Sequence, residues 1–266
     1  MHRILIVLVT LVLVACGPRP AARSIAPQVS GMTAAPSVQV VAQNFGDLDP
    51  TDWQGLPPQR HPVHGIDVSV WQGDIDFVRA RANGVNFVFM KATEGGDRED
   101  PNFDRNWQAA AQAGVPRGAY HLFYHCRSAA EQARWYIDHV PRSTGALPPV
   151  LDMEWTPTSP TCRTRQSPTV LRAEARVFIN IVAAHYGRQP ILYTTLDFFH
   201  DNDMGQLTGV SFWLRSVAAP VERSHPEQDW TFWQYSSTGQ VRGISGAVDL
   251  NAFSGSRAAW AAFVRG

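Results

Sequence analysis

The sequence predicts an α/β fold in which five strand–helix units are followed by three further strands. Apolar stretches of strand length alternate with amphipathic stretches of helix length from residue 63 to residue 194. Beyond residue 194, three more apolar stretches follow with little helical pattern between them, before a final amphipathic helix. Such a parallel sheet can close into a barrel, and an open doubly wound sheet is the alternative that this pattern leaves open.

The predicted elements follow one another from the first apolar stretch, at Val63, to the end of the chain. The first two helices are each followed by a glycine, Gly84 and Gly114, the residue that proteins prefer just beyond a helix C-terminus. The expected strands cover residues 63–69, 85–91, 118–124, 150–154, 190–194, 211–215, 230–235 and 241–250, and the expected helices cover residues 74–83, 102–113, 129–140, 168–186 and 257–264.

The composition indicates a globular chain without a nucleic-acid partner. Of 266 residues, 44% are hydrophobic and 17% charged, so the chain can bury one large core. The formal charge is zero, from 23 basic and 23 acidic residues, and no basic run could follow a phosphate backbone.

Neither a cofactor nor a metal is expected. No glycine-rich phosphate loop follows the first strand, which argues against a nucleotide cofactor. Two histidine pairs have spacings seen in metal sites but lack a third ligand motif, so packed or capping roles are expected for His61 with His64 and for His121 with His125. We expect the protein to act as a monomer.

The amino terminus has the features of an export signal. Arg3 precedes an apolar segment, residues 4–14, which is too short to cross a bilayer of about 30 Å as a helix. Leu13-Val14-Ala15-Cys16 resembles the bacterial lipoprotein signal, in which cleavage before the cysteine is coupled to its lipidation. We therefore expect an exported protein anchored through Cys16 to a bacterial membrane, facing the periplasm or the cell wall. An ordinary signal peptide with a chance cysteine is the alternative.

Composition divides the chain into three parts. Residues 1–16 form the expected signal peptide, and residues 17–60 are rich in Pro, Ala, Ser and Gln without a sustained period. This second part is expected to be a tether that holds a domain away from a membrane surface. Residues 61–266 form the expected folded domain.

The acidic end of the fourth predicted strand is the first candidate site. If residues 150–154 form a strand, Asp152 and Glu154 share a face and are displaced by about 6.6 Å along the strand. Polar groups at the carboxyl ends of barrel strands are usually catalytic. The alternative is a pair of acids at an exposed strand end that has no catalytic role.

Two cysteines lie within the expected domain. In an exported chain, a disulfide between Cys126 and Cys162 is chemically allowed and would close a loop of 36 residues. The chain-entropy model gives such a loop a stabilisation of roughly 3 to 4 kcal/mol. We expect the bond, and two unpaired thiols are the alternative.

Six motifs in order carry a resemblance across most of the region from residue 63 to residue 253. The chain resembles glycoside hydrolase family 25, the Chalaropsis-type lysozymes or N-acetylmuramidases. This resemblance implies a flattened TIM-like barrel of five βα units completed by three strands. It also implies hydrolysis of the β-1,4 bond between N-acetylmuramic acid and N-acetylglucosamine in peptidoglycan glycan strands. The motifs are Gly65-Ile66-Asp67-Val68-Ser69 with Trp71-Gln72, Lys91-Ala92-Thr93-Glu94-Gly95, Gly118-Ala119-Tyr120-His121, Asp152-Met153-Glu154, Trp233-Gln234-Tyr235-Ser236 and Val248-Asp249-Leu250-Asn251.

The resemblance implies roles for four acids. Glu154 matches the general acid that protonates the leaving oxygen, Asp152 matches its partner, and Asp67 and Asp249 match two further acids that ring the cleft. Capping or turn roles are the alternative for Asp67 and Asp249. Because Asp152 shares a strand and a face with the acid, it is poorly placed to activate water on the opposite face of the sugar, and we expect retention. The nucleophile is then either the substrate's 2-acetamido oxygen, which we favour, or a carboxylate.

Aromatic and amide side chains near the motifs are the expected sugar contacts. A flat ring at a strand end can stack on a sugar or can pack at the rim of the barrel. The expected contacts are Trp71, Tyr120, Trp155, Tyr193, Trp233 and Gln234.

One departure from the family pattern concerns the sixth strand. Where the family usually has Trp-Ile-Ala, this chain has Phe212-Trp213-Leu214-Arg215-Ser216, which puts a bulky cation where a small residue is common. Substrate preference near that strand is therefore open.

Two other functions also remain: a catalytically weak peptidoglycan-binding lipoprotein, and an enzyme acting on chitin. Val150 stands where chitin-degrading barrels carry an acid, which argues against the second.

Overall fold

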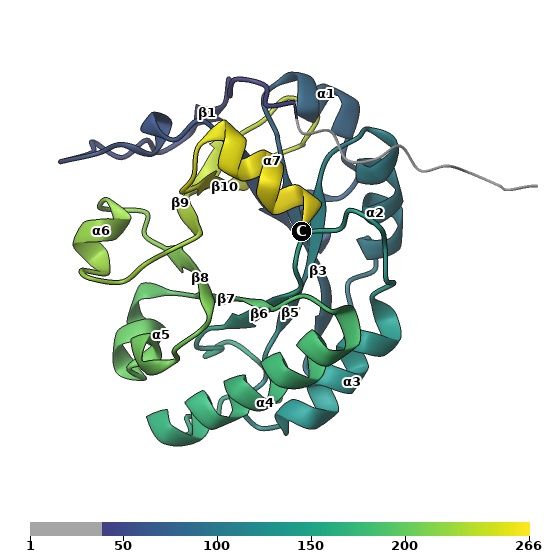
Figure 1. The fold of residues 1–266 in the computed structure, drawn as a ribbon, viewed down its shortest axis with the longest axis vertical. Helices are drawn as coiled ribbons and strands as arrows, with labels where there is room; N and C mark the ends of the chain where they lie inside the picture. Colours follow the sequence, from purple (N-terminus) through teal and green to yellow (C-terminus); the bar gives the residue numbers. More distant parts are fainter. Residues whose placement is uncertain (1–38) are drawn as a thin grey trace, which may run out of the picture. The chain divides into compact units, whose positions relative to one another are not determined.

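A computed structural model describes residues 39–266 of the chain (Figure 1). The strands are β1 (Gly46–Asp47), β2 (His64–Val68), β3 (Val88–Glu94), β4 (Arg98–Glu99), β5 (Arg117–Leu122), β6 (Val150–Met153), β7 (Ile191–Thr194), β8 (Ser211–Arg215), β9 (Phe232–Gln240) and β10 (Val248–Phe253). The helices are α1 (Phe77–Ala82), α2 (Phe103–Gln112), α3 (Ala129–His139), α4 (Pro168–Tyr186), α5 (Leu196–Asp201), α6 (Val221–Ser224) and α7 (Arg257–Arg265), and the 3₁₀ helices are η1 (Pro58–Arg60), η2 (Val70–Gln72) and η3 (Met204–Gln206).

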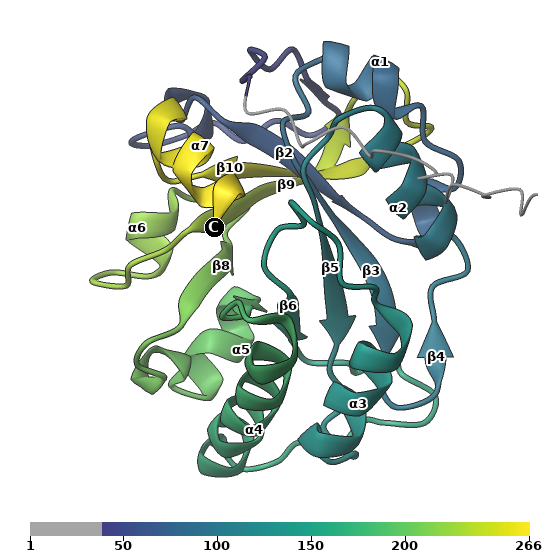
Figure 2. The same cartoon turned by 45° about the vertical axis from the view of Figure 1, so that its right-hand side comes forward.

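Eight strands close into a barrel, so the open doubly wound alternative is wrong. Seven strands of the ring run parallel to one another, in the order β2, β3, β5, β6, β7, β8 and β9. β10 lies antiparallel between β9 and β2 and completes the ring. The short strands β1 and β4 pair with β9 and β3 outside this ring. Figure 2 shows β3 and β5 side by side, with α2 and α3 outside them.

Alternation along the strands separates an outer core from an inner one. Ile66 and Val68 belong to the core between the strands and the helices, whereas Phe87 and Phe89 fill the interior of the barrel. Two motif glycines make room for these rings. A Cβ atom at Gly65 would lie 2.4 Å from the carbonyl oxygen of Phe87, and one at Gly118 would lie 2.6 Å from the ring of Phe89.

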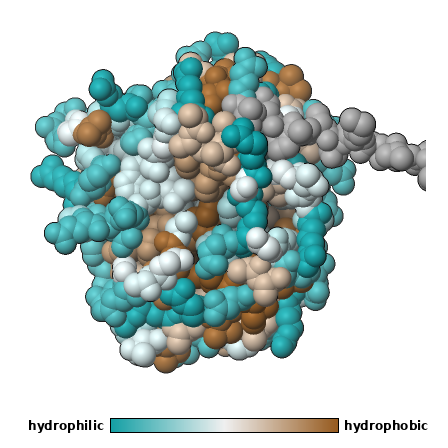
Figure 3. All heavy atoms as spheres, viewed as in Figure 1, coloured by the Kyte–Doolittle hydropathy of each residue, from teal (hydrophilic) through white to brown (hydrophobic). Residues whose placement is uncertain are grey.

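Helix α7 covers the amino end of the barrel. Its Trp260 ring lies 5.3 Å from the ring of Phe87, just before β3, and 5.2 Å from that of Phe253, where the antiparallel β10 ends. The face that carries α7 and α4 shows small hydrophobic groups scattered among hydrophilic ones (Figure 3). The carboxyl end of the parallel strands is therefore the end left for a site.

The folded region begins earlier than expected, which corrects the boundary predicted at residue 60. The side-chain amide of Asn86 bonds both backbone groups of Val41, at 2.8 and 2.9 Å. Further along, the Trp53 ring lies 5.2 Å from the ring of Trp233. Residues 39–60 are thus part of the domain and not of a tether. The signal peptide, Cys16 and the first half of the predicted tether lie outside the described residues.

Two smaller corrections concern the last third of the chain. The predicted strand at residues 241–250 is wrong in its first half, because β9 continues to Gln240 and a turn separates it from β10. The short helices α5 and α6 follow β7 and β8, where little helix was expected. From residue 39 onward, no helix is long and apolar enough to cross a membrane.

Candidate active site

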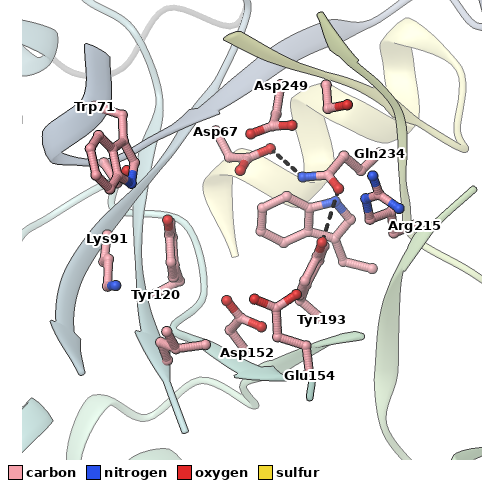
Figure 4. Close-up of a pocket in the computed structure, with 14 residues that line it drawn as sticks. Asp67, Trp71, Lys91, Tyr120, Asp152, Glu154, Tyr193, Arg215, Gln234 and Asp249 are labelled. Atoms are coloured by element: carbon pink, nitrogen blue, oxygen red, sulfur yellow. Dashed lines mark hydrogen bonds between the residues drawn. The ribbon is translucent and has the colours of Figure 1, made fainter. Parts of the chain in front are cut away.

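A cleft of about 360 Å³ lies at the carboxyl ends of the barrel strands (Figure 4). It brings together eight of the ten residues predicted to act in catalysis or in sugar binding. The residues that line it are Asp67, Ser69, Trp71, Lys91, Tyr120, Leu122, Asp152, Glu154, Tyr193, Trp213, Arg215, Gln234, Ser237 and Asp249.

The two pairs of acids lie on opposite sides of this cleft. In Figure 4, Asp67 and Asp249 lie on one side, and Asp152 and Glu154 lie on the other. Asp67 and Asp249 are direct neighbours in the register between β2 and β10. Tyr120 of β5 points into the space between the two pairs. The four acids therefore surround one space that a sugar ring can enter.

Asp152 and Glu154 come from the end of β6. Asp152 is only 7% exposed, and its Oδ1 atom is buried without a hydrogen-bond partner. Glu154 follows the last residue of the strand, and its backbone carbonyl accepts a 2.8 Å hydrogen bond from Nε2 of His125. A buried carboxylate oxygen without a donor is rare in folded proteins, which suggests that a ligand supplies the donor.

Burial makes both carboxyls of this pair hold protons more tightly. Burial, and then the charge of Glu154, raise the pKa of Asp152 well above its usual range. Burial raises the pKa of Glu154 to about 6, against the opposing charges of Arg215 and Lys91. Because two buried carboxylates this close repel each other, the pair keeps one proton near neutral pH.

Asp67 is held by a network of side-chain amides. Its Oδ2 atom accepts hydrogen bonds from Nε2 of Gln234 at 2.9 Å and from Nδ2 of Asn251 at 2.7 Å. The Tyr193 hydroxyl donates to Oε1 of Gln234 at 2.9 Å, and Nε1 of Trp213 donates to Oδ1 of Asn251 at 2.8 Å. Each amide is thus oriented so that its NH₂ group faces the carboxylate.

The pKa values of Asp67 and Asp249 are also raised. Burial raises the pKa of Asp67 to about 6, although the two amide donors oppose this shift. Burial, together with the charge of Asp67, raises the pKa of Asp249 to about 8. Burial and the neighbouring charge therefore favour the protonated form of Asp249, whereas the two amide hydrogen bonds favour the ionised form of Asp67.

Trp71 lies at the mouth of the cleft with its ring in solvent. Its side chain is 86% exposed, the most exposed large apolar residue of the described chain. The backbone on either side is nevertheless held firmly: the Val70 amide donates to Asp100 Oδ2 at 2.6 Å, and the Gln72 side chain donates to the Ala247 carbonyl at 3.1 Å. A fixed backbone with an exposed ring is the arrangement expected of a stacking platform.

Trp233 and Trp155 do not line the cleft. Trp233 lies on the outer face of β9 with 0% exposure, and its Nε1 donates to the Ser216 carbonyl at 2.7 Å. The prediction that it contacts sugar is therefore wrong. Trp155 turns away from the cleft, because its Nε1 donates to Asp201 Oδ2 at 2.8 Å and its ring packs against Phe198.

Two cations that sequence reasoning did not assign also line the cleft, Lys91 and Arg215. Lys91 forms an ion pair with Glu94, whose carboxylate also accepts a hydrogen bond from the Tyr124 hydroxyl. The alternation of strand residues could have found both, since Lys91 is two residues beyond Phe89 and Arg215 is two beyond Trp213.

The expected disulfide is present. Cys126 and Cys162 are bonded, with their Cα atoms 5.7 Å apart. The bond joins the loop after β5 to the loop after β6, next to His125, which holds the backbone of Glu154. It therefore links the two loops that flank Glu154.

The histidines that were weighed as metal ligands are packed within the fold. His121 contacts Thr93 Oγ1 at 2.8 Å and Gln132 Oε1 at 3.1 Å, and His64 contacts the Tyr235 hydroxyl at 3.1 Å. Across residues 39–266, no group of three or more His, Cys, Asp or Glu side chains could hold a metal ion.

Comparisons with known proteins agree with this geometry. The chain is 40% identical over 217 residues to the uncharacterized protein YegX of Escherichia coli (strain K12), a match that covers 79% of this chain and 76% of YegX. It is 36% identical over 217 residues to Lysozyme M1 of Streptomyces globisporus, covering 76% of this chain and 71% of that protein.

Solved structures and a family model give the same assignment. The crystal structure of the bacterial lysozyme from Streptomyces coelicolor matches with a TM-score of 0.68 and 36% identity, covering 76% of this chain and 97% of that one. The model of Glycosyl hydrolases family 25 matches residues 66–244. The chain therefore belongs to glycosyl hydrolases family 25.

Proposed function

We propose that this chain is an exported lysozyme that hydrolyses the β-1,4 bonds between N-acetylmuramic acid and N-acetylglucosamine in peptidoglycan. Family membership and the likeness to proteins named lysozyme support a lysozyme-type glycoside hydrolase. The observation that carries the proposal is the carboxyl pair Asp152 and Glu154, which lies largely buried on one side of the cleft with both pKa values raised.

Glu154 is the general acid in this proposal. A glycosidic oxygen leaves only when it is protonated, so the acid must hold a proton near neutral pH. Burial raises the pKa of Glu154 to about 6, which keeps a useful fraction protonated. Its side chain is also less buried than that of Asp152, as a group that must reach the scissile bond requires.

Asp152 orients the 2-acetamido group of the substrate. The unpartnered Oδ1 atom of Asp152 is an acceptor that an acetamido N–H can satisfy. Such a donor favours the ionised form of Asp152, and the shared proton then resides on Glu154. The acetamido oxygen attacks the anomeric carbon, and the Asp152 carboxylate stabilises the positive charge of the oxazolinium ion that forms. Water then opens this ion, so the product retains its configuration.

Asp67, Asp249 and the polar groups beside them form the opposite wall. Two amide donors fix Asp67, so its carboxylate is positioned to accept hydrogen bonds from the sugar. Burial raises the pKa of the Tyr120 and Tyr193 hydroxyls well above their usual range, so both remain protonated donors. Trp71 supplies a face on which a further sugar of the strand stacks.

The test is digestion of purified peptidoglycan, followed by mass spectrometry of the new reducing ends. The proposal requires N-acetylmuramic acid at those ends. Glu154→Gln should keep the fold and lose about 10² to 10⁴-fold in turnover, because the amide cannot donate the proton. The matched control is Glu222→Gln, which alters an exposed carboxylate on α6.

Three results would count against the proposal. New ends of N-acetylglucosamine would indicate cleavage of the other bond. Activity of Glu154→Gln within threefold of the wild type would remove Glu154 from the acid role. Binding of wild-type protein to peptidoglycan without any turnover would favour the second candidate, a lipoprotein that uses the cleft only to hold glycan.

We also propose that Cys16 carries lipid and that the enzyme is anchored to a bacterial membrane. Residues 17–38 would then separate the anchor from the first described residue and could reach about 75 Å at full extension. The disulfide is consistent with export, because such bonds persist in oxidising compartments. Cys16→Ala should leave the protein in the soluble fraction. Retention of this variant in membranes after a high-salt wash would refute the anchor.

A further inference from the structure

Arg215 is a cation in the cleft without a partner of its own. It is the last residue of β8 and pairs in register with Gln234 of β9. Figure 4 shows its guanidinium on the flank of the cleft beside Gln234. Among residues 39–266, no carboxylate lies within 4.0 Å of this guanidinium. The guanidinium also donates no hydrogen bond to any of these residues.

Lys91, the other cation of the cleft, differs because it forms an ion pair with Glu94. The charge of Arg215 acts on Asp67, Glu154 and Asp249 from a distance, since it lowers the pKa of each. The five N–H donors of Arg215 are therefore available to a ligand.

The ligand of Arg215 should be an anion that belongs to the substrate. The proposed reaction assigns proton transfer to Glu154 and charge stabilisation to Asp152, so it leaves the guanidinium of Arg215 without a chemical role of its own. A guanidinium prefers carboxylate or phosphate, which it binds through two parallel hydrogen bonds. Arg215 is therefore placed to recognise a feature that only some substrates carry.

The glycan strand offers one such group close to the sugar ring. N-acetylmuramic acid carries a lactyl group, whose carboxyl is an uncharged amide when a stem peptide is attached and a free carboxylate when it is not. The carboxylates of a stem peptide lie further from the ring, by about 3.5 Å for each residue. A side chain beside the catalytic acids reaches the lactyl group first.

We propose that Arg215 binds the free lactyl carboxylate of N-acetylmuramic acid, so that the enzyme prefers glycan strands from which the stem peptides have been removed. This inference rests on the proposed muramidase function. The reaction that must supply the substrate is amide hydrolysis, in which water cleaves the bond between the lactyl carboxyl and the first amine of the peptide. That step releases the peptide with a free amine and leaves the carboxylate on the glycan.

The experiment compares the same glycan strands before and after removal of their peptides by an amidase. The full-length protein is assayed for new reducing ends, and kcat/KM is determined on both substrates. We expect the wild type to prefer the peptide-free strands by at least tenfold, the lower end of what a charge-assisted contact contributes. In Arg215→Gln the loss on peptide-free strands should exceed the loss on peptide-bearing strands by a similar factor. Arg215→Lys should recover part of the preference.

Two controls are needed. The first tests whether the preference depends on the charge of the lactyl group or on its size, and the second tests whether removal of any arginine has the same effect. Peptide-free strands whose lactyl carboxylate has been reduced to an alcohol keep the small size but lack the charge, and the wild type should cleave them at least tenfold less efficiently. Arg134→Ala removes an exposed arginine of α3 and should keep the wild-type preference.

Each other outcome has a definite meaning. Equal cleavage of the carboxylate and alcohol forms, or an equal loss of both activities in Arg215→Gln, would overturn the inference. A larger loss on peptide-bearing strands would assign Arg215 to a stem carboxylate and would also overturn it. Absence of turnover on every substrate would instead count against the proposed function.

Discussion

Replacing Asp249 with asparagine should stabilise the folded protein at pH 8 and have little effect at pH 4. Burial and the charge of Asp67 raise the pKa of Asp249 from 3.8 to about 8. Between these two values the folded state holds a proton that the unfolded state has released. Stability from this group is therefore fully present below about pH 4 and is lost as pH rises towards 8.

The magnitude follows from the size of this shift. One pKa unit corresponds to about 1.4 kcal/mol, so a shift of about four units sets an upper limit near 6 kcal/mol. Asp249 is partly exposed, and solvent screens its charge, so we expect a gain of about 1 to 3 kcal/mol. For a domain of this size, 1 kcal/mol corresponds to about 2 to 4 °C in Tm. The amide is close in shape to the carboxyl, so packing should be kept.

The assay is thermal and urea unfolding of the wild type and Asp249→Asn at pH 4, 6 and 8, with the disulfide intact. The free energy of unfolding should differ most at pH 8 and converge at pH 4. Asp229→Asn, which alters an exposed carboxylate, is the matched control and should show no such trend. An equal effect of Asp249→Asn at all three pH values, or a destabilisation at pH 8, would refute the electrostatic reasoning.

Three further predictions concern rate, the disulfide and the cleft mouth. The value of kcat/KM should fall as pH rises past the point where the carboxyl pair loses its last proton, and Arg215→Gln should move this fall to higher pH, because it removes a positive charge that favours the ionised form of Glu154; a fall at unchanged pH would contradict this. Cys126→Ser should lower the free energy of unfolding by about 3 to 4 kcal/mol, and dithiothreitol should then have no further effect on Tm; a Tm within 2 °C of wild type would contradict it. Trp71→Ala should raise KM about 3- to 10-fold with Tm unchanged, since the ring is 86% exposed, whereas an unchanged KM would remove its stacking role.

The strand pattern predicted most of the barrel and the acid pair, because alternation is a local property. The same rule placed Asp152 on the interior face and could have excluded Trp233 from the predicted sugar contacts. Trp233 is the neighbour of Gln234, and adjacent residues of a strand face opposite sides. Gln234 points into the cleft, so its neighbour must enter the outer core. A motif on one strand contains residues of both faces, so membership of the motif alone does not place a side chain in the cleft.

Other features depended on contacts between distant parts of the chain. Trp155 lies beyond the last paired residue of β6, where alternation ends, and its direction is set by Asp201 and Phe198 of α5. That helix was not predicted. Residues 39–60 show no hydrophobic period of a helix or a strand. Individual contacts attach this segment to the domain, such as the hydrogen bonds between Val41 and Asn86. A composition rich in Pro and Ala does not distinguish such a segment from a tether.

The central claim is that Asp152 and Glu154 act through the substrate's own acetamido group. The most direct measurement is the inhibition constant of a stable thiazoline analogue of the oxazolinium ion, compared with that of the parent sugar. The wild type should bind the thiazoline at least about 100-fold more tightly, because the analogue resembles the high-energy species, and Asp152→Asn should lose most of that advantage. Equal inhibition of the wild type by the thiazoline and the parent sugar would contradict the claim and favour direct attack by a carboxylate.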